Sequence, residues 1–152
     1  MKAPDQTRFE WVRFADFSAA LLYDVLRFRQ AIFVVEQRCA YPDLDGLDQQ
    51  AEHLLLRRAD ELAGCLRLIP FPDEARVAIG RVAVAEAMRH RGLGRKLMIE
   101  ALARCRRDYR NHAVTLTGQA YLVPFYGSLG FAVTSAPFDD YGLSHVHMAL
   151  RG

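Results

Sequence analysis

Apolar side chains recur at helical spacing in two parts of the chain. After Ser18, a residue type that caps helices with its side-chain oxygen, the apolar positions Leu21, Val25, Phe28 and Ile32 repeat every three to four residues. This spacing places them on one stripe and predicts a helix that begins after Ser18. A second helix is predicted over 93–109, and its apolar face holds Leu97, Met98, Ala101, Leu102 and Cys105.

Short apolar and β-branched runs, bounded by turn-forming residues, occupy much of the remaining chain. They predict strands over 9–14, 53–58, 62–69, 77–84, 113–117, 131–133 and 144–150. Pro70 and Pro72 should end the hairpin of the second and third strands, and 39–50 is predicted to be a loop. A short helix over 123–129 precedes Gly130, which suits a left-handed helix cap. The order β-α-β-β-β-α-β-α-β-β predicts an α/β fold of the α+β type with a largely antiparallel front half.

Length and composition limit the class of protein. The 152 residues fit one domain, 1–152, which is large enough to build a core without disulfides or metal. No apolar stretch is long enough to span a membrane, and 1–6 lacks the apolar segment of a secretion signal. The cysteines Cys39, Cys65 and Cys105 form no C-x-x-C pair, and their odd number disfavours a complete disulfide framework. These features favour a cytoplasmic protein with no membrane partner.

The charge distribution has one concentrated region. The formal net charge of +2 is too small to indicate nucleic-acid binding. Arginines nevertheless gather at the end of the predicted second helix, at Arg104, Arg106, Arg107 and Arg110. Such cations favour the negative end of a helix and are typical of a solvated face. A nucleic-acid patch is the alternative, but no recognisable nucleic-acid motif accompanies it, so no nucleic-acid partner is expected.

A glycine-containing turn, Arg89-His90-Arg91-Gly92-Leu93-Gly94, joins the predicted strand over 77–84 to the second helix. A strand, a glycine turn and a helix direct backbone N–H groups and the positive helix end to one point, which suits a diphosphate. A P-loop would require Gly-Lys-Ser/Thr where Gly94-Arg95-Lys96 stands. A dinucleotide fingerprint would require a third glycine at Leu97. Two interpretations of this turn are left: a phosphate site of another kind, or a turn with a purely structural role.

Other segments carry a more specific pattern, in order along nearly the whole chain. They are 26–37 (LRFRQAIFVVEQ), 43–48 (DLDGLD), His53, 80–84 (GRVAV), 116–119 (LTGQ), 121–131 (YLVPFYGSLGF) and 138–145. Together with Arg-x-x-Gly-x-Gly at 89–94, these segments resemble the GNAT superfamily of N-acetyltransferases, and its ElaA/YjcF-like branch in particular. The match departs from the branch at Gly118, where alanine is expected before the glutamine.

The resemblance implies a GNAT fold, which is a mixed sheet of six to seven strands with helices on both faces. Its front half is antiparallel, and its fourth and fifth strands splay apart. The resemblance also implies acetyl-CoA as donor substrate, and no metal. In the family, one strand pairs with the pantetheine arm and the glycine turn holds the pyrophosphate. Cofactor binding is therefore assigned to Val82, Ala83, Val84, Arg89, Arg91, Gly92, Leu93, Gly94, Arg95 and Gln119.

Two residues are candidate catalytic groups. In the resembling enzymes the tyrosine of the "FY" segment protonates the departing thiolate, which makes Tyr126 the candidate general acid. Alternatively, Tyr126 is a half-buried aromatic residue whose hydroxyl takes any available partner. Glu36, at the end of the first predicted helix, could act as a base through water, bind a cationic acceptor, or form only an ion pair. Gln119 would lie at the splay, unless it is an ordinary loop amide.

Three further residues are assigned to acceptor binding. Arg81 lies in an apolar run predicted to be buried on both faces, where an unpaired guanidinium is costly, so it should pair with a carboxylate. Glu36 is the expected partner, in either a structural or a substrate-binding role. His145 matches a histidine of the branch, and His53 could be site wall or polar core. His145 and His147 have metal-ligand spacing, but no further ligand set is apparent.

The acidic loop over 39–50 contains a partial match to a calcium-binding loop. Asp43, Asp45, Gly46 and Glu52 fit four positions of an EF-hand, but Tyr41 occupies the first ligand position and a strand follows. The similarity is therefore interpreted as chance. These carboxylates could instead attract an amine substrate or form a solvated turn.

These observations predict an N-acetyltransferase that moves an acetyl group from acetyl-CoA to a primary amine of a small molecule or peptide. None of the cysteines has an evident activating base, which favours direct attack in a ternary complex over a covalent enzyme intermediate. The alternative is a non-catalytic acyl-CoA-binding sensor or interaction module, although Tyr126 and Gln119 favour catalysis. A homodimer is possible from family habit, and fold-level analogy does not identify the acceptor.

Overall fold

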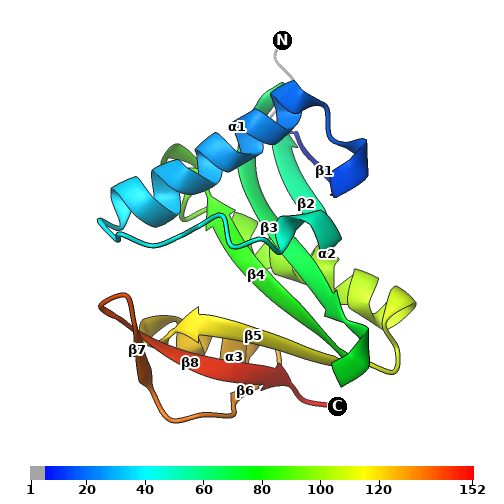
Figure 1. Ribbon diagram of the computed structural model, residues 1–152, viewed down its shortest axis with the longest axis vertical. Coiled ribbons are helices and arrows are strands. Elements are labelled where there is room, and N and C mark those ends of the chain that lie inside the picture. Colours follow the sequence, from blue (N-terminus) through cyan, green and yellow to red (C-terminus); the bar gives the residue numbers. More distant parts are fainter. Residues whose placement is uncertain (1–5) are drawn as a thin grey trace.

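The computed structural model describes residues 6–152, which form one mixed β-sheet with helices on both faces (Figure 1). The strands are β1 Thr7–Arg13, β2 Glu52–Arg58, β3 Glu61–Phe71, β4 Arg76–Val84, β5 Ala113–Gln119, β6 Phe131–Val133, β7 Phe138–Asp140 and β8 Leu143–Leu150. The helices are α1 Ala19–Gln30, α2 Leu93–Asp108 and α3 Val123–Ser128, and a π-helical segment, Ala31–Glu36, extends α1. Short 3-10 turns cover Phe14–Asp16, Asp48–Gln50, Pro72–Glu74, Glu86–Met88 and Ala120–Leu122. The sheet order is β1-β2-β3-β4-β5-β8-β6, with β7 also paired to β8.

The predicted fold class is confirmed, with two differences in its strands. The sheet has eight strands where six to seven were expected, and the additional strand is β7, whose sequence Phe-Asp-Asp is not typical of a strand because aspartate is depleted there. The prediction that Pro70 ends a strand is wrong, since β3 continues to Phe71. Pairing of β3 with β2 stops at Leu68, so Pro70 lies where only β4 still pairs with β3. A residue without an N–H is tolerated where one side of a strand has no neighbour.

Helix α1 covers one face of the sheet. Its predicted cap is present, because the Ser18 side chain accepts a hydrogen bond from the Leu21 N–H at 3.1 Å. From the predicted apolar stripe, Val25 and Ile32 are buried against a cluster that includes Leu55 of β2. The helical stripe therefore holds the segment after α1 close to β3 and β4.

Helices α2 and α3 cover the opposite face, behind the sheet in Figure 1. Leu97 and Met98 of α2 have no exposed surface, and Gly130 takes the predicted left-handed conformation after α3, with φ of 100°. At the end of α2, Arg104 is bound to Glu52 at 2.7 Å instead of being fully solvated. Within residues 6–152, no helix has the length and apolar character needed to cross a bilayer.

Strands β4 and β5 are parallel neighbours for only part of their length. Their register joins Arg76–Ile79 to Ala113–Leu116 and ends there. Beyond this point the two strands diverge, as Figure 1 shows, while β5 remains paired with β8 as far as Gln119. The expected splay between the fourth and fifth strands is therefore present, and it opens toward the carboxyl ends of both.

The acidic loop after α1 is fixed by buried ion pairs. Arg29 of α1 binds Asp43 at 3.1 Å and Asp48 at 2.7 Å, and its side chain is almost fully buried. Arg67 of β3 also binds Asp48, at 2.8 Å, together with Asp45. Neither a solvated turn nor a set of unpaired carboxylates describes this loop. Its acids neutralise buried arginines instead, which a buried charge requires.

Candidate active site

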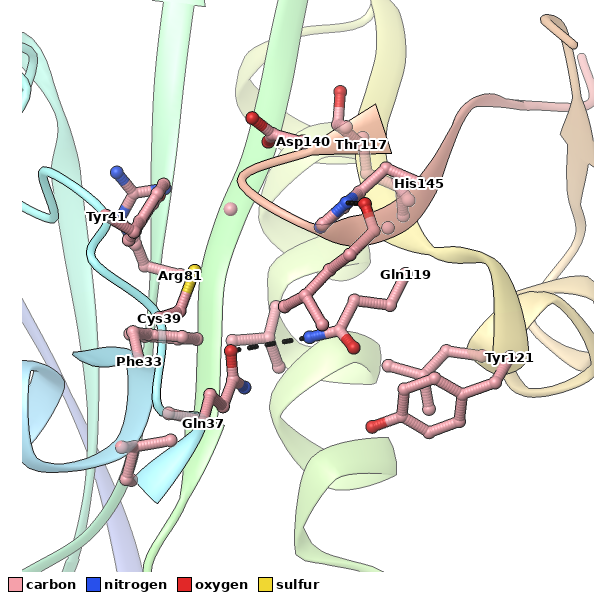
Figure 2. A pocket seen from close by; sticks show the side chains of 18 of the residues that line it. Phe33, Gln37, Cys39, Tyr41, Arg81, Thr117, Gln119, Tyr121, Asp140 and His145 are labelled. Atoms are coloured by element: carbon pink, nitrogen blue, oxygen red, sulfur yellow. Dashed lines mark hydrogen bonds between the residues drawn. The ribbon is translucent and has the colours of Figure 1, made fainter. Parts of the chain in front are cut away.

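The splay encloses a cavity of about 380 Å³. Figure 2 shows that its walls come from distant parts of the chain, with Phe33 and Gln37 after α1, Arg81 on β4, and Gln119 at the end of β5. Tyr126 of α3 and residues of the β7–β8 hairpin complete the lining. Because β4 and β5 separate here, the cavity reaches the main chain of both strands.

The main chain of β4 is irregular where it borders the cavity. Arg81 has φ of 52°, in the left-handed region that residues other than glycine rarely adopt, and the register against β3 shifts at this point. Val82, Ala83 and Val84 line the cavity after this bulge. No strand within residues 6–152 pairs with them on the β5 side, so a ligand with amide groups can bind there as an added strand.

The glycine-containing part of the turn, 91–94, lies at the start of α2 and does not line the cavity. Gly92 has φ of 75° and accepts a hydrogen bond from the Lys96 N–H, so it forms the N-terminal boundary of the helix. A Cβ at Gly92 would meet nothing within 4 Å, which means that backbone conformation, not space, favours glycine there. The first-turn amides of Leu93, Gly94 and Arg95 come at the helix end that attracts anions.

The turn contributes Arg89 to the cavity, whereas Arg91 to Arg95 do not line it. The Arg89 Nε–H donates to the Val84 carbonyl oxygen at 3.0 Å, and its Nη2 binds Glu36 at 2.8 Å. Both side chains of this ion pair are about one-third exposed, so the pair itself contributes little stability. It does tie the segment after α1 to the turn before α2.

Arg81 has a carboxylate partner, but the predicted partner, Glu36, is wrong. The Arg81 Nε binds Asp43 at 2.7 Å, and its Nη2 binds Asp45 at 3.2 Å. Its guanidinium also lies 4.8 Å from the centre of the Tyr41 ring. The buried acidic loop therefore determines where Arg81 points, and Glu36 pairs with Arg89 instead.

Tyr126 is 7% exposed and lines the cavity. Burial raises its pKa to about 12, so its hydroxyl keeps its proton at neutral pH. Within the described chain, the hydroxyl has no hydrogen-bond partner and can donate to a ligand. Gly118 of β5 makes this position possible, because a Cβ there would lie 2.9 Å from the Cε2 atom of the Tyr126 ring.

Gln119 bridges the two sides of the splay. Its Nε2 donates to the Gln37 Oε1 at 3.5 Å, as the dashed line in Figure 2 shows. Gln37 follows the π-helical extension of α1, so this contact joins the end of β5 to the α1 side of the cavity. Sequence reasoning singled out Gln119 but gave Gln37 no role, since the segment 26–37 carries no sign of which residue reaches the cavity.

The tight β7–β8 hairpin brings a second acidic residue to the cavity. Tyr141 and Gly142 have φ of 52° and 87°, and positive values at both central positions are typical of a type I′ turn. Asp140 and Leu143 flank this turn and line the cavity. Tyr141 closes the hairpin against the loop after α1, with its ring 5.6 Å from that of Tyr41. Sequence reasoning missed Asp140, although Asp-Tyr-Gly is a turn signal.

The two histidines assigned to the acceptor lie in different places. His145 lines the cavity, and its Nδ1 lies 2.9 Å from the Leu143 carbonyl oxygen. His53 does not line the cavity. It is buried, its Nε2 contacts the Asp48 carbonyl oxygen at 3.0 Å, and burial lowers its pKa. This placement matches the polar-core alternative for His53.

The three cysteines are buried. Burial raises the pKa of Cys65 to about 12 and that of Cys105 to about 11, which keeps both thiols protonated and unreactive. Cys39 lines the cavity, where its Sγ contacts the Tyr141 carbonyl oxygen at 3.5 Å. Cys39 thus helps to hold the loop after α1 against the hairpin.

A splayed mixed sheet, an unpaired strand segment facing the splay and a glycine turn before a helix are the features of the GNAT acyltransferase fold. Residues 27–151 match the model of the acetyltransferase (GNAT) domain. The chain therefore belongs to the GNAT acetyltransferase family, as its sequence motifs predicted.

Individual relatives agree with this assignment. Escherichia coli ElaA is 37% identical over 145 residues, which cover 92% of this chain and 95% of ElaA. The ElaA crystal structure matches with a TM-score of 0.90 and 35% identity, covering 96% of this chain and all of ElaA. An acyl-CoA N-acyltransferase from Pseudomonas aeruginosa gives a TM-score of 0.91 and 34% identity, covering 96% of this chain and all of that one. A GNAT family acetyltransferase from Elizabethkingia anophelis, solved with acetyl-CoA bound, is 16% identical with a TM-score of 0.65, covering 95% and 97%, and shares the fold.

Proposed function

We propose that the protein is an N-acetyltransferase that moves an acetyl group from acetyl-CoA to a primary amine by direct attack in a ternary complex. The observation that carries this proposal is the partnerless Tyr126 hydroxyl, which shares one cavity with the unpaired main chain of Val82 to Val84. A hydrogen-bond donor of this kind, in the same cavity as an unpaired strand edge, suits a thioester whose sulfur must accept a proton.

The donor would lie along β4. Amides of its pantetheine arm would pair with Val82 to Val84, and its pyrophosphate would meet the first-turn amides of α2 from Leu93 onward. The bound acetyl-CoA of the E. anophelis protein supports this choice of donor, because the two chains share the fold. Arg89 contributes mainly by holding the strand end and the turn together, since Val84 and Glu36 already occupy its guanidinium.

The acceptor amine must lose its proton before it attacks, and His145 is suited to take it. A carbonyl oxygen only accepts, so the contact between Nδ1 and the Leu143 oxygen places the proton of neutral His145 on Nδ1. Nε2 then carries a lone pair. Glu36, the other candidate base, accepts from Arg89, which favours its ion-pair alternative.

The reaction balances with these groups. The amine nitrogen forms a bond to the thioester carbon, and a main-chain N–H of β4 stabilises the oxyanion. Collapse breaks the C–S bond. Tyr126 then gives its proton to the sulfur and takes up another proton from solvent. The nitrogen, now bonded to the acetyl group, releases its extra proton. Burial disfavours tyrosinate, but it equally disfavours the thiolate, which therefore takes the proton more readily than it would in water.

Tyr126→Phe tests the proposal. The variant should lower kcat by about 100-fold, the lower end of the usual range for general acids, and leave acetyl-CoA affinity within about twofold. The rate is measured as thiol release from acetyl-CoA across a panel of amines. The affinity for acetyl-CoA is measured by calorimetry.

Tyr23→Phe is the matched control, because Tyr23 is 69% exposed on α1 and away from the cavity. Unchanged kcat in Tyr126→Phe would remove Tyr126 as the acid. Tight acetyl-CoA binding without turnover of any amine would favour the alternative, an acyl-CoA sensor.

A further inference from the structure

The charged side chains that line the cavity differ in how they are paired. Four of them line it: Glu36, Arg81, Arg89 and Asp140. Glu36 pairs with Arg89 at 2.8 Å, and Arg81 pairs with carboxylates of the acidic loop. Asp140 has no hydrogen-bond or ion-pair partner in the chain from residue 6 to 152. Because Arg89 is paired with Glu36 and Arg81 with the carboxylates of the acidic loop, Asp140 is the lining carboxylate that no cation of residues 6–152 neutralises.

The backbone around Asp140 is held in place. Asp140 pairs with Leu143 across the positive-φ turn, and the Gly142 N–H donates to Asp139 at 3.3 Å. Tyr141 rests against Tyr41 on the opposite side of the splay. Figure 2 shows the Asp140 carboxylate on the same side of the cavity as His145. A cation in the cavity would thus meet a carboxylate presented by an ordered hairpin.

We propose that Asp140 binds a second positive charge of the acceptor, so that the preferred acceptor is a diamine: a primary amine joined by a short aliphatic chain to another ammonium group. This inference rests on the proposed acetyl transfer. Asp140 is unsuited to the attacking nitrogen itself, because a carboxylate beside an ammonium stabilises the protonated, unreactive form. The nitrogen that reacts must instead lie toward His145 and Tyr126, with the charged end at Asp140.

The same arrangement disfavours acceptors that carry a carboxylate. Arg81, the cation on the other side of the cavity, already faces Asp43 and Asp45, so it offers no unpaired positive charge. An acidic group placed at the far end of an acceptor would meet Asp140 instead. Repulsion of this kind adds to specificity as much as the attraction does. We therefore expect kcat/KM to be highest for a diamine, lower for an amine with an uncharged tail, and lowest for an amino acid.

Three acceptors with the same five-carbon chain test this order: 1,5-diaminopentane, pentylamine and 5-aminopentanoate. Their tails are positive, neutral and negative. For the wild-type protein, kcat/KM from thiol release should be about two- to fivefold higher for the diamine than for pentylamine, as expected for one partly solvated ion pair. Asp140→Asn should bring this ratio close to one. Asp24→Asn, which removes one exposed carboxylate from α1, should leave the ratio as it is in the wild type.

Calorimetric binding of the same three compounds, with CoA present, separates this inference from the proposed reaction. Turnover of all three amines at equal kcat/KM would leave the acetyltransferase function intact and overturn the role of Asp140. Absence of turnover, with tighter binding of the diamine that is lost in Asp140→Asn, would support Asp140 and refute acetyl transfer. A diamine preference that survives in Asp140→Asn, in rate or in binding, would also overturn the inference.

Discussion

Gly118 lies against the ring of Tyr126, and one methyl group there should alter the rate of the reaction. A Cβ would come within 2.9 Å of one ring carbon and 3.3 Å of another, so the ring must move. A displacement of about 1 Å in a catalytic group can cost about 100-fold in rate. We expect Gly118→Ala to lower kcat by about tenfold or more, with a stability loss of about 1–3 kcal/mol from overpacking.

The control for Gly118→Ala is Gly127→Ala, on α3 next to Tyr126. A Cβ at Gly127 would meet nothing within 4 Å, and alanine suits a helix better than glycine does. Thiol release and thermal unfolding of both variants give the comparison. Wild-type kcat in Gly118→Ala would show that the ring can move without loss of function, and that this glycine does not position Tyr126.

The placement of single residues at the cavity was easiest to predict where a motif carries them, as for Tyr126, and hardest where a loop conformation decides. The sequence predicted that Arg81 needs a carboxylate, which follows from burial alone. It could not predict that Asp43 and Asp45 supply it, because that depends on how the loop after α1 folds back onto β4. Asp140 was missed for the same reason, since nothing in a three-residue strand indicates which wall of a cavity it joins.

At the scale of elements, the acidic loop should make stability depend on pH. Hydrogen bonds and charge from Arg67 outweigh burial and lower the pKa of Asp45 to about 2, and Arg29 and Arg67 lower that of Asp48. A carboxyl group whose pKa is lower in the folded state than in the unfolded chain stabilises the fold above its unfolded pKa, near 3.8. That contribution is lost as pH falls toward the folded value. The free energy of unfolding should therefore decrease between about pH 4 and pH 2.

Urea unfolding at pH 6, 4 and 3 measures this dependence. Asp45→Asn removes one of the two titrating groups and should flatten the slope, whereas the exposed Asp24→Asn should not. An equal slope in the wild type and Asp45→Asn would show that Asp45 has no pKa difference between the folded and unfolded states.

Periodic elements could be predicted from the sequence because burial on one face imposes their pattern. α1, α2 and most strands start or end within a few residues of their predicted bounds. β3 differed because proline at a strand with one unpaired side costs little. The cavity itself required the whole molecule, since it is formed where β4 and β5 separate and its walls come from segments that lie more than a hundred residues apart in the chain.

For the whole molecule, binding of acetyl-CoA should raise the stability of the fold, because a ligand that binds only the native state shifts the unfolding equilibrium. At a concentration 100 times Kd the gain is about 2.7 kcal/mol, which a thermal scan detects as a higher Tm. Gly92→Asp should reduce this gain, since a carboxylate would stand at the amides proposed to hold the pyrophosphate.

The comparison needs a control for strain, because aspartate at a positive φ destabilises the protein even without ligand. Gly46→Asp provides it: Gly46 has φ of 81° against 75° for Gly92, and a Cβ at either position meets nothing within 4 Å. Both variants therefore carry the same added charge and similar backbone strain, and only Gly92 adjoins the proposed phosphate site. We expect a Tm loss without ligand in both variants, a normal acetyl-CoA shift in Gly46→Asp, and a shift reduced by at least half in Gly92→Asp. Equal shifts in the two variants would place the pyrophosphate elsewhere.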